Sequence, residues 1–158
     1  LHGYCNIYYE FFQNLVNTNI NFLEIGIFQG RSLAMWNDFF KKGSIYGIDI
    51  SIKEFDLFKK ELKKMGAFKD KQITVKEGDS TKNKLFENIK FDVILDDGCH
   101  KIESQINTFK NYYPLLKNGG YYIIEDLRGK YHIEKLSDFV ENKNIVYYLE
   151  NNLIIFQK

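Results

Sequence analysis

Residues 21–32 read NFLEIGIFQGRS, and this stretch decides the fold that the sequence predicts. The apolar segment 21–26 predicts a strand that ends in glycine. Residues 32–40 predict a helix with Leu33 and Trp36 on one apolar face, because apolar residues recur there at helical spacing. The glycines between strand and helix let the backbone turn sharply and approach a ligand closely. A strand, a glycine turn and a helix in this order predict the first unit of a parallel α/β sheet.

Strand and helix patterns alternate along the rest of the chain. The last two predicted strands, 144–149 and 152–156, are joined by a tight Glu150-Asn151 turn, and this spacing requires antiparallel pairing. The alternation predicts an α/β fold: a Rossmann-like, doubly wound, mostly parallel seven-stranded sheet with a C-terminal antiparallel β-hairpin. Further strands are predicted at 44–49, 72–77, 91–96 and 121–125, the last entered through a Gly119-Gly120 turn, and further helices at 53–64, around 102–109 with a kink near Pro114, and at 134–140.

Length and composition narrow the class of protein. The chain has 158 residues, which fits one domain over residues 1–158, and it begins with Leu1, so we expect some upstream residues to be missing. The net charge of +1 gives no electrostatic reason to expect nucleic acid or an anionic membrane as a partner. Cys5 and Cys99 form no CxxC pair, which favours free thiols in a reducing, cytoplasmic compartment. No apolar run approaches the ~18–20 residues of a membrane span.

Acidic residues end the first three predicted strands. An antiparallel last strand is typical of class I methyltransferases. In such an enzyme the start of the helix at 32–40 would face the methionine carboxylate of the cofactor, and Glu24 would hold the amino group of the cofactor. Asp49 could accept both ribose hydroxyls, and Asp79 with Ser80 would border the adenine. Alternatively, Glu24 and Asp49 cap loops and Asp79 is an N-cap. The predicted S-adenosylmethionine site comprises Glu24, Gly26, Gly30, Ser32, Asp49, Asp79, Ser80 and Asp96.

More carboxylates follow the fourth and fifth predicted strands. Asp96 and Asp97 end one strand, Glu125 and Asp126 end the other, and neighbouring parallel strands bring their carboxyl ends to one edge. Like charges packed together cannot all stay ionised unless a proton or a cation compensates. An all-oxygen cluster suits Mg²⁺ or another hard divalent cation.

That cation would have a chemical use. An aliphatic hydroxyl is about as weak an acid as water, whose pKa is ~15.7, so it is a poor nucleophile near neutrality. A divalent metal lowers the pKa of an oxygen ligand and fixes its position. His100 follows Asp97 across a glycine turn, and its unperturbed pKa of ~6.5 suits a base that takes the proton. His100 and Asp97 are therefore the predicted catalytic residues.

Two motifs carry a resemblance to a known family. DDGCH at 96–100 and LKNGGYYIIEDL at 116–127 resemble the DDGSH and LKPGG-IEDL motifs of macrocin and mycinamicin sugar O-methyltransferases. The resemblance implies metal ligands at Asp97, Glu125 and Asp126, and a base at His100. It implies transfer of a methyl group to a saccharide or small-molecule hydroxyl and, by analogy, a homo-oligomer. The chain departs from the family pattern at Cys99, Asn118 and Arg128, so the residues that contact the acceptor can differ.

Other interpretations stay open at this point. The acceptor could be a phenol, a carboxylate or an amine, or the chain could be a catalytically silent binding module. A nicotinamide dehydrogenase is disfavoured by Glu24, which occupies the first glycine position of the dinucleotide motif. Asp96 and Asp97 could be turn residues neutralised by Lys101 and Arg128, and His100 could merely open a helix. The aromatic residues between Tyr4 and Phe12 could form a lid over the cofactor or a helix packed on the sheet.

Overall fold

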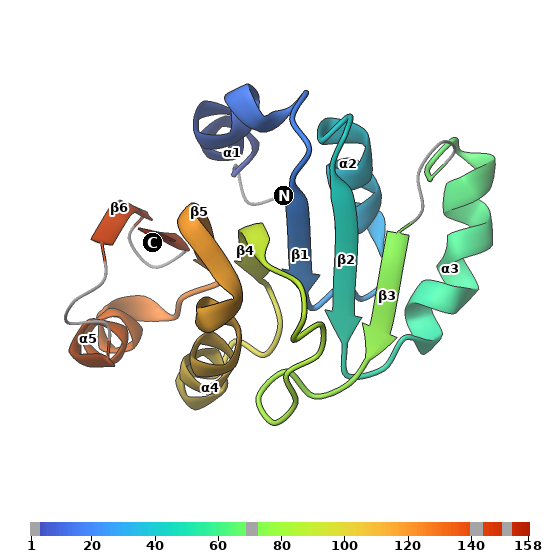
Figure 1. Cartoon of the computed structure of the whole chain (residues 1–158). Helices are drawn as coiled ribbons and strands as arrows, with labels where there is room; N and C mark the ends of the chain where they lie inside the picture. The colour runs from blue at the N-terminus through green and yellow to red at the C-terminus, as the bar shows by residue number, and fades with distance from the viewer. Residues whose placement is uncertain (1–3, 69–72, 140–143, 150–152) are drawn as a thin grey trace.

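The computed structural model of the protein describes residues 4–68, 73–139, 144–149 and 153–158. Helices and strands alternate along most of the chain (Figure 1). The elements are α1 (Cys5–Phe12), a 3₁₀ turn (Gln13–Leu15), β1 (Asn21–Ile25), α2 (Arg31–Phe39), β2 (Ser44–Asp49), α3 (Lys53–Lys64), β3 (Ile73–Glu77), β4 (Phe91–Asp96), α4 (Ile102–Tyr112), a 3₁₀ turn (Tyr113–Leu115), β5 (Leu116–Glu125), α5 (Gly129–Phe139), β6 (Asn144–Leu149) and β7 (Leu153–Gln157).

Within the described residues, seven strands form one sheet in the order β3-β2-β1-β4-β5-β7-β6. Strands β1 to β5 pair in parallel, whereas β7 runs antiparallel to both β5 and β6. The predicted Rossmann-like, mostly parallel sheet with antiparallel C-terminal strands is thus confirmed. The predicted Glu150-Asn151 turn lies outside the described residues.

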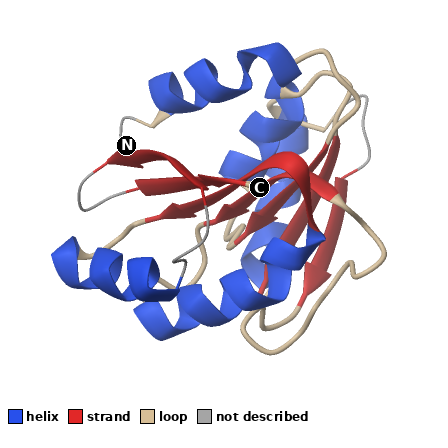
Figure 2. Cartoon of the chain, turned by 60° about the vertical axis from the view of Figure 1, so that its left-hand side comes forward, coloured by secondary structure: helices blue, strands red, loops and turns tan. Residues whose placement is uncertain are grey.

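Helices cover both faces of the sheet (Figure 2). Successive side chains of a strand point to opposite faces, and β1 shows this clearly. Phe22 packs on the face covered by α1, α2 and α3, where its ring lies 4.8 Å from that of Trp36. Leu23 packs on the other face, with Phe109 of α4 and Leu136 of α5. Both faces of the sheet are therefore buried, as a parallel sheet requires.

The predicted turn at Gly119-Gly120 is wrong, because β5 begins at Leu116 and continues through both glycines. The C-terminal residue explains the difference: Gly119 N–H donates to the Lys158 carbonyl at 2.6 Å, and Lys158 N–H donates to the Gly120 carbonyl at 3.1 Å. A register shift in the β4–β5 pairing between Phe91 and Val93 accommodates the irregular strand. Helix α5 likewise begins at Gly129, before the predicted start at 134. In the described part of the chain, no helix is long and apolar enough to cross a membrane.

Candidate active site

A cleft of about 550 Å³ opens at the carboxyl ends of the central strands. This is the place where parallel α/β sheets bind ligands, because the strand order reverses there. Most of the predicted site residues line the cleft: Gly26, Asp49, Asp79, Ser80, Asp97, His100, Glu125 and Asp126. Four do not line it, namely Glu24, Gly30, Ser32 and Asp96.

The loop after β1 touches the loop after β4 at Gly26. The Gly26 N–H donates to the Ile48 carbonyl at 2.8 Å, and Asp97 N–H donates to the Ile25 carbonyl at 2.9 Å. Gly26 has φ +90°, and a Cβ built there would lie 2.2 Å from the Asp97 carbonyl oxygen. Glycine is therefore required here for the contact between two loops that both line the cleft.

The other two predicted residues of this turn, Gly30 and Ser32, are not among the residues that line the cleft. A Cβ at Gly30 would lie 2.5 Å from the Phe55 ring, so this glycine lets α2 begin close against α3. The Ser32 hydroxyl faces Glu24, where it opposes the rise that burial causes in the pKa of that carboxyl. The expected contact of Gly30 and Ser32 with a ligand stays a prediction.

Glu24 is completely buried. Burial raises the pKa of its carboxyl to about 8; the Ser32 hydroxyl opposes the rise, and the charges of Asp97, Glu125 and Asp49 add to it. Neither oxygen meets the geometry of a hydrogen bond with a described residue. A buried carboxylate without a full set of donors is costly, so a cationic ligand nearby would be stabilising. The predicted contact between Glu24 and an amino group stays a prediction.

Asp49 shapes the cleft as well as lining it. One carboxylate oxygen accepts the Phe28 N–H at 2.8 Å, and the other accepts the Ser51 N–H at 3.1 Å. These bonds hold Phe28 in the left-handed region at φ +43°, with its ring largely exposed. The loop-capping role and the ligand-binding role of Asp49 are compatible, since each carboxylate oxygen has a further lone pair.

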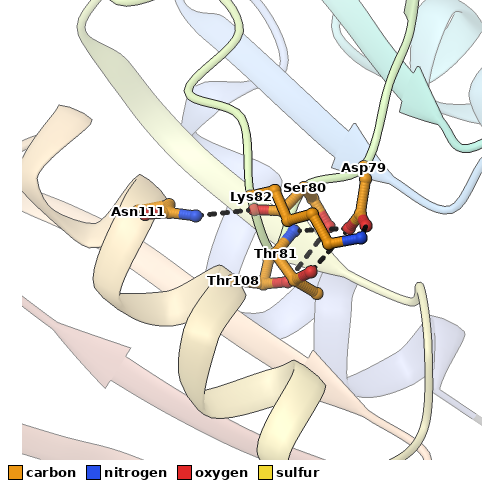
Figure 3. A network of polar contacts seen from close by, with 6 residues as sticks. All are labelled: Asp79, Ser80, Thr81, Lys82, Thr108 and Asn111. Carbon is orange, nitrogen blue, oxygen red and sulfur yellow. Dashed lines mark hydrogen bonds and ion pairs between the residues drawn. The ribbon is translucent and has the colours of Figure 1, made fainter.

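The loop after β3 is built on Asp79 and tied to α4 (Figure 3). Asp79 Oδ1 accepts the Thr81 N–H at 3.0 Å, and Asp79 Oδ2 pairs with Lys82 at 3.1 Å, so Asp79 caps its own turn while lining the cleft. The Ser80 hydroxyl shares a 3.0 Å hydrogen bond with the Thr108 hydroxyl. The Ser80 backbone carbonyl accepts a hydrogen bond from the Asn111 side-chain amide at 2.9 Å. Helix α4 thus fixes the cleft wall at Ser80.

Thr108→Val should cost about 1 kcal/mol in the free energy of unfolding, because the buried Thr108 hydroxyl and its bond to Ser80 are lost. Urea unfolding at equilibrium measures the loss. Thr18→Val is the matched control: its hydroxyl bonds the Leu15 carbonyl at an exposed site, and its cost should stay below about 0.5 kcal/mol. Equal losses in the two variants would contradict the anchoring role of Thr108.

Carboxylates crowd the β4–β5 end of the cleft. Burial raises the pKa of Asp97 to about 8, with further increases from the charges of Glu125 and Asp126. The pKa of Glu125 rises to about 7, again chiefly through burial. Asp96 is buried beneath them, where its Oδ1 accepts the Gly98 N–H at 3.3 Å and burial raises its pKa to about 7. A cation at this end of the cleft would relieve the repulsion between these groups.

Two of these carboxylates, Asp97 and Asp126, converge with His100. Asp97, His100 and Asp126 each offer a ligand atom, and the three atoms lie within 4.8 Å of one another. The His100 Nε2 lies 3.8 Å from Asp126 Oδ2. The two carboxylate oxygens of this group, with the Glu125 carboxylate in the same cleft, fit a hard divalent cation. Glu125 lies beside this group, and its Oε1 accepts a hydrogen bond from the Tyr8 hydroxyl.

Sequence reasoning missed the contribution of α1 to this cluster. Besides Tyr8, the Tyr4 hydroxyl donates to Asp126 Oδ1 at 3.4 Å. The aromatic N-terminal stretch was an available signal, but its spacing indicates only a buried helical face. The structure shows that α1 packs on the sheet and that the hydroxyls of Tyr8 and of the N-cap residue Tyr4 contact the acidic cluster.

Comparison with known proteins places the chain among methyltransferases. Residues 23–127 match the family described as "Methyltransferase domain". The chain is 32% identical over 139 residues to demethylmacrocin O-methyltransferase of Streptomyces fradiae, a match that covers 80% of this chain and 32% of that protein. It is 31% identical over 140 residues to mycinamicin VI 2''-O-methyltransferase of Micromonospora griseorubida, with the same two coverages. The chain thus spans about a third of the length of these relatives.

A solved structure shares the fold. The MycE methyltransferase in complex with Mg, SAH and mycinamycin VI superposes with a TM-score of 0.75 at 23% identity, covering 100% of this chain and 49% of that one.

Proposed function

Because the chain belongs to the methyltransferase domain family, we propose that residues 1–158 form a single domain that transfers the methyl group of S-adenosylmethionine to a hydroxyl of a sugar or related natural product, with a divalent metal. The observation that carries the proposal is the convergence of Asp97, His100 and Asp126 in the same cleft as Gly26 and Asp49. The O-methyltransferases named above, whose acceptors are natural products, support the hydroxyl acceptor.

The cleft provides a place for the cofactor between two of its walls. Asp49 would accept the ribose hydroxyls, and the loop of Asp79 and Ser80 would border the adenine, because both line the cleft on one side. The methionine part would lie along Gly26, which lines the cleft near the carboxylate cluster. A sulfonium needs little activation, so these residues act mainly by aligning the methyl group with the acceptor oxygen.

The other end of the cleft would hold the metal and the acceptor. Asp97, Glu125 and Asp126 are the proposed ligands of Mg²⁺, which when bound would make an acceptor hydroxyl more acidic and fix its position. His100 would take the hydroxyl proton as the oxygen–carbon bond forms and the sulfur–carbon bond breaks. The products would be the methylated acceptor, S-adenosylhomocysteine and the proton released from the hydroxyl.

Calorimetric titration with S-adenosylhomocysteine tests the cofactor assignment. Asp49→Asn should weaken binding about tenfold or more, since a hydrogen bond to a charged group contributes about 1.5–3 kcal/mol. The matched control is Asp38→Asn: its carboxylate pairs with Lys41 on the exposed face of α2, and its affinity should equal that of wild type. A folded wild-type protein that binds no S-adenosylhomocysteine would contradict the proposal and favour a silent module.

A further inference from the structure

The first helix of the protein reaches the acidic cluster from the far end of the sequence. The hydroxyl of Tyr8, in the middle of α1, donates to Glu125 Oε1, although the two residues are 117 positions apart. One turn earlier, the Tyr4 hydroxyl donates to Asp126 Oδ1. The two consecutive carboxylates at and just after the end of β5 therefore receive hydrogen bonds from Tyr8 of α1 and from its N-cap residue Tyr4.

The ring of Tyr8 is held on all sides by the aromatic core. It stacks on Phe12 with 6.0 Å between ring centroids and an interplanar angle of 15°. Trp36 of α2 meets it edge-on at 5.2 Å, and only 5% of Tyr8 is exposed. Core packing of this kind leaves a side chain few alternative rotamers. The position of the Tyr8 hydroxyl is thus set by α1 and α2.

We propose that Tyr8 is a positioning residue of the metal site: its hydroxyl holds Glu125 Oε1, so that Oε2 is left to face the cation, and Tyr4 supports Asp126 in the same way. This inference rests on the proposed function, because it takes Glu125 and Asp126 as metal ligands. A carboxylate has two oxygens, and a donor on one of them restricts the orientation of the other. Hydrogen-bond partners of metal ligands typically contribute 10–100-fold to metal affinity.

A phenylalanine at position 8 would fill the core equally well but would leave Glu125 without this donor. The Glu125 carboxyl would then be free to rotate. Binding of the cation would have to order this carboxyl, which would weaken the observed affinity. Tyr8 therefore links the seating of α1 on the sheet to the geometry of the cluster.

The test is calorimetric titration with Mg²⁺ alone, without any cofactor, on wild type and Tyr8→Phe. We expect Tyr8→Phe to bind Mg²⁺ about 10–100-fold more weakly. The matched control is Tyr121→Phe, whose ring also packs on Phe12, at 5.7 Å, but whose hydroxyl accepts from Gln157. Its Mg²⁺ affinity should equal that of wild type. Thermal unfolding without Mg²⁺ shows whether each variant is folded.

Repeating the Tyr8→Phe substitution in a Glu125→Gln variant shows whether Tyr8 acts through Glu125 or through the general structure of the protein. In Glu125→Gln the Tyr8 hydroxyl has lost its carboxylate, so adding Tyr8→Phe should change the remaining Mg²⁺ affinity little. Tyr4→Phe should weaken Mg²⁺ binding less than Tyr8→Phe does. If Tyr8→Phe does not fold, the Mg²⁺ affinity of Tyr4→Phe tests whether these tyrosine hydroxyls position the carboxylates.

Equal Mg²⁺ affinities in wild type and Tyr8→Phe, or unchanged affinity in Tyr4→Phe where only that variant folds, would overturn the inference and leave the proposed methyl transfer standing. An equally large effect of Tyr8→Phe in the Glu125→Gln background would overturn it too. A wild-type protein that binds S-adenosylhomocysteine but no Mg²⁺ would remove the metal from the proposed function, and this inference with it.

Discussion

Asp97→Asn is expected to weaken Mg²⁺ binding by more than about a hundredfold, which exceeds the usual cost of losing an outer hydrogen-bond partner. Asp97 belongs to the converging group with His100 and Asp126. It directly follows β4, and its backbone is held by the hydrogen bond from its N–H to the Ile25 carbonyl at 2.9 Å. Asparagine keeps the size of the side chain but removes the negative charge, and a hard cation depends on that charge. The affinity for S-adenosylhomocysteine should stay close to that of wild type, because the cofactor is proposed to lie toward Asp49.

Paired titrations with Mg²⁺ and with S-adenosylhomocysteine check both parts of this prediction. Asp92→Asn is the control: this carboxylate lies on the same strand but bonds the Asn21 N–H and pairs with Lys117 at the opposite end. It should bind Mg²⁺ as wild type does. If Asp97→Asn retained its Mg²⁺ affinity, or if Asp92→Asn lost as much, the metal would have to lie elsewhere.

The sequence was sufficient to predict where the cleft lies. Strands of parallel sheets bring their carboxyl ends to one edge, so acids that end successive strands must gather there. Asp49, Asp97 and Asp126 all follow this rule, and all line the cleft. The periodicity of apolar residues predicts where the strands lie. Once the strands are located, the acidic residue at or just after the end of each strand is predicted to lie at the cleft.

Contacts between distant segments could not be predicted in this way. The bond from Tyr8 to Glu125 joins residues whose local patterns indicate only a buried helix face and a strand end. The contact of Gly30 with a ligand stays a prediction, whereas the close approach of Gly30 to the Phe55 ring is a contact that no spacing in the first strand-helix unit could indicate. The course of β5 through Gly119 and Gly120 involves hydrogen bonds to Lys158, a residue far along the chain.

Gly26→Ala should destabilise the protein strongly, for two reasons that act together. An alanine at φ +90° is strained by about 1–2 kcal/mol, since the left-handed region brings Cβ close to backbone oxygen. The new Cβ would also lie 2.2 Å from the Asp97 carbonyl oxygen, so one loop must move, and overpacking of this kind costs about 1–3 kcal/mol. Together these effects predict a loss of about 2–5 kcal/mol in the free energy of unfolding.

Gly119→Ala separates the two causes, because Gly119 has φ +78° but, apart from its chain neighbours, no described residue has an atom within 4 Å of a Cβ built there. It should show the backbone strain alone, about 1–2 kcal/mol. Urea unfolding of both variants measures the difference, and a thermal midpoint should fall by about 2–4 °C for each kcal/mol in a chain of this size. Equal losses would mean that the Asp97 loop yields to the methyl group at little cost. A larger loss in Gly26→Ala, accompanied by weaker Mg²⁺ binding, would show that the β1 loop holds Asp97 in place.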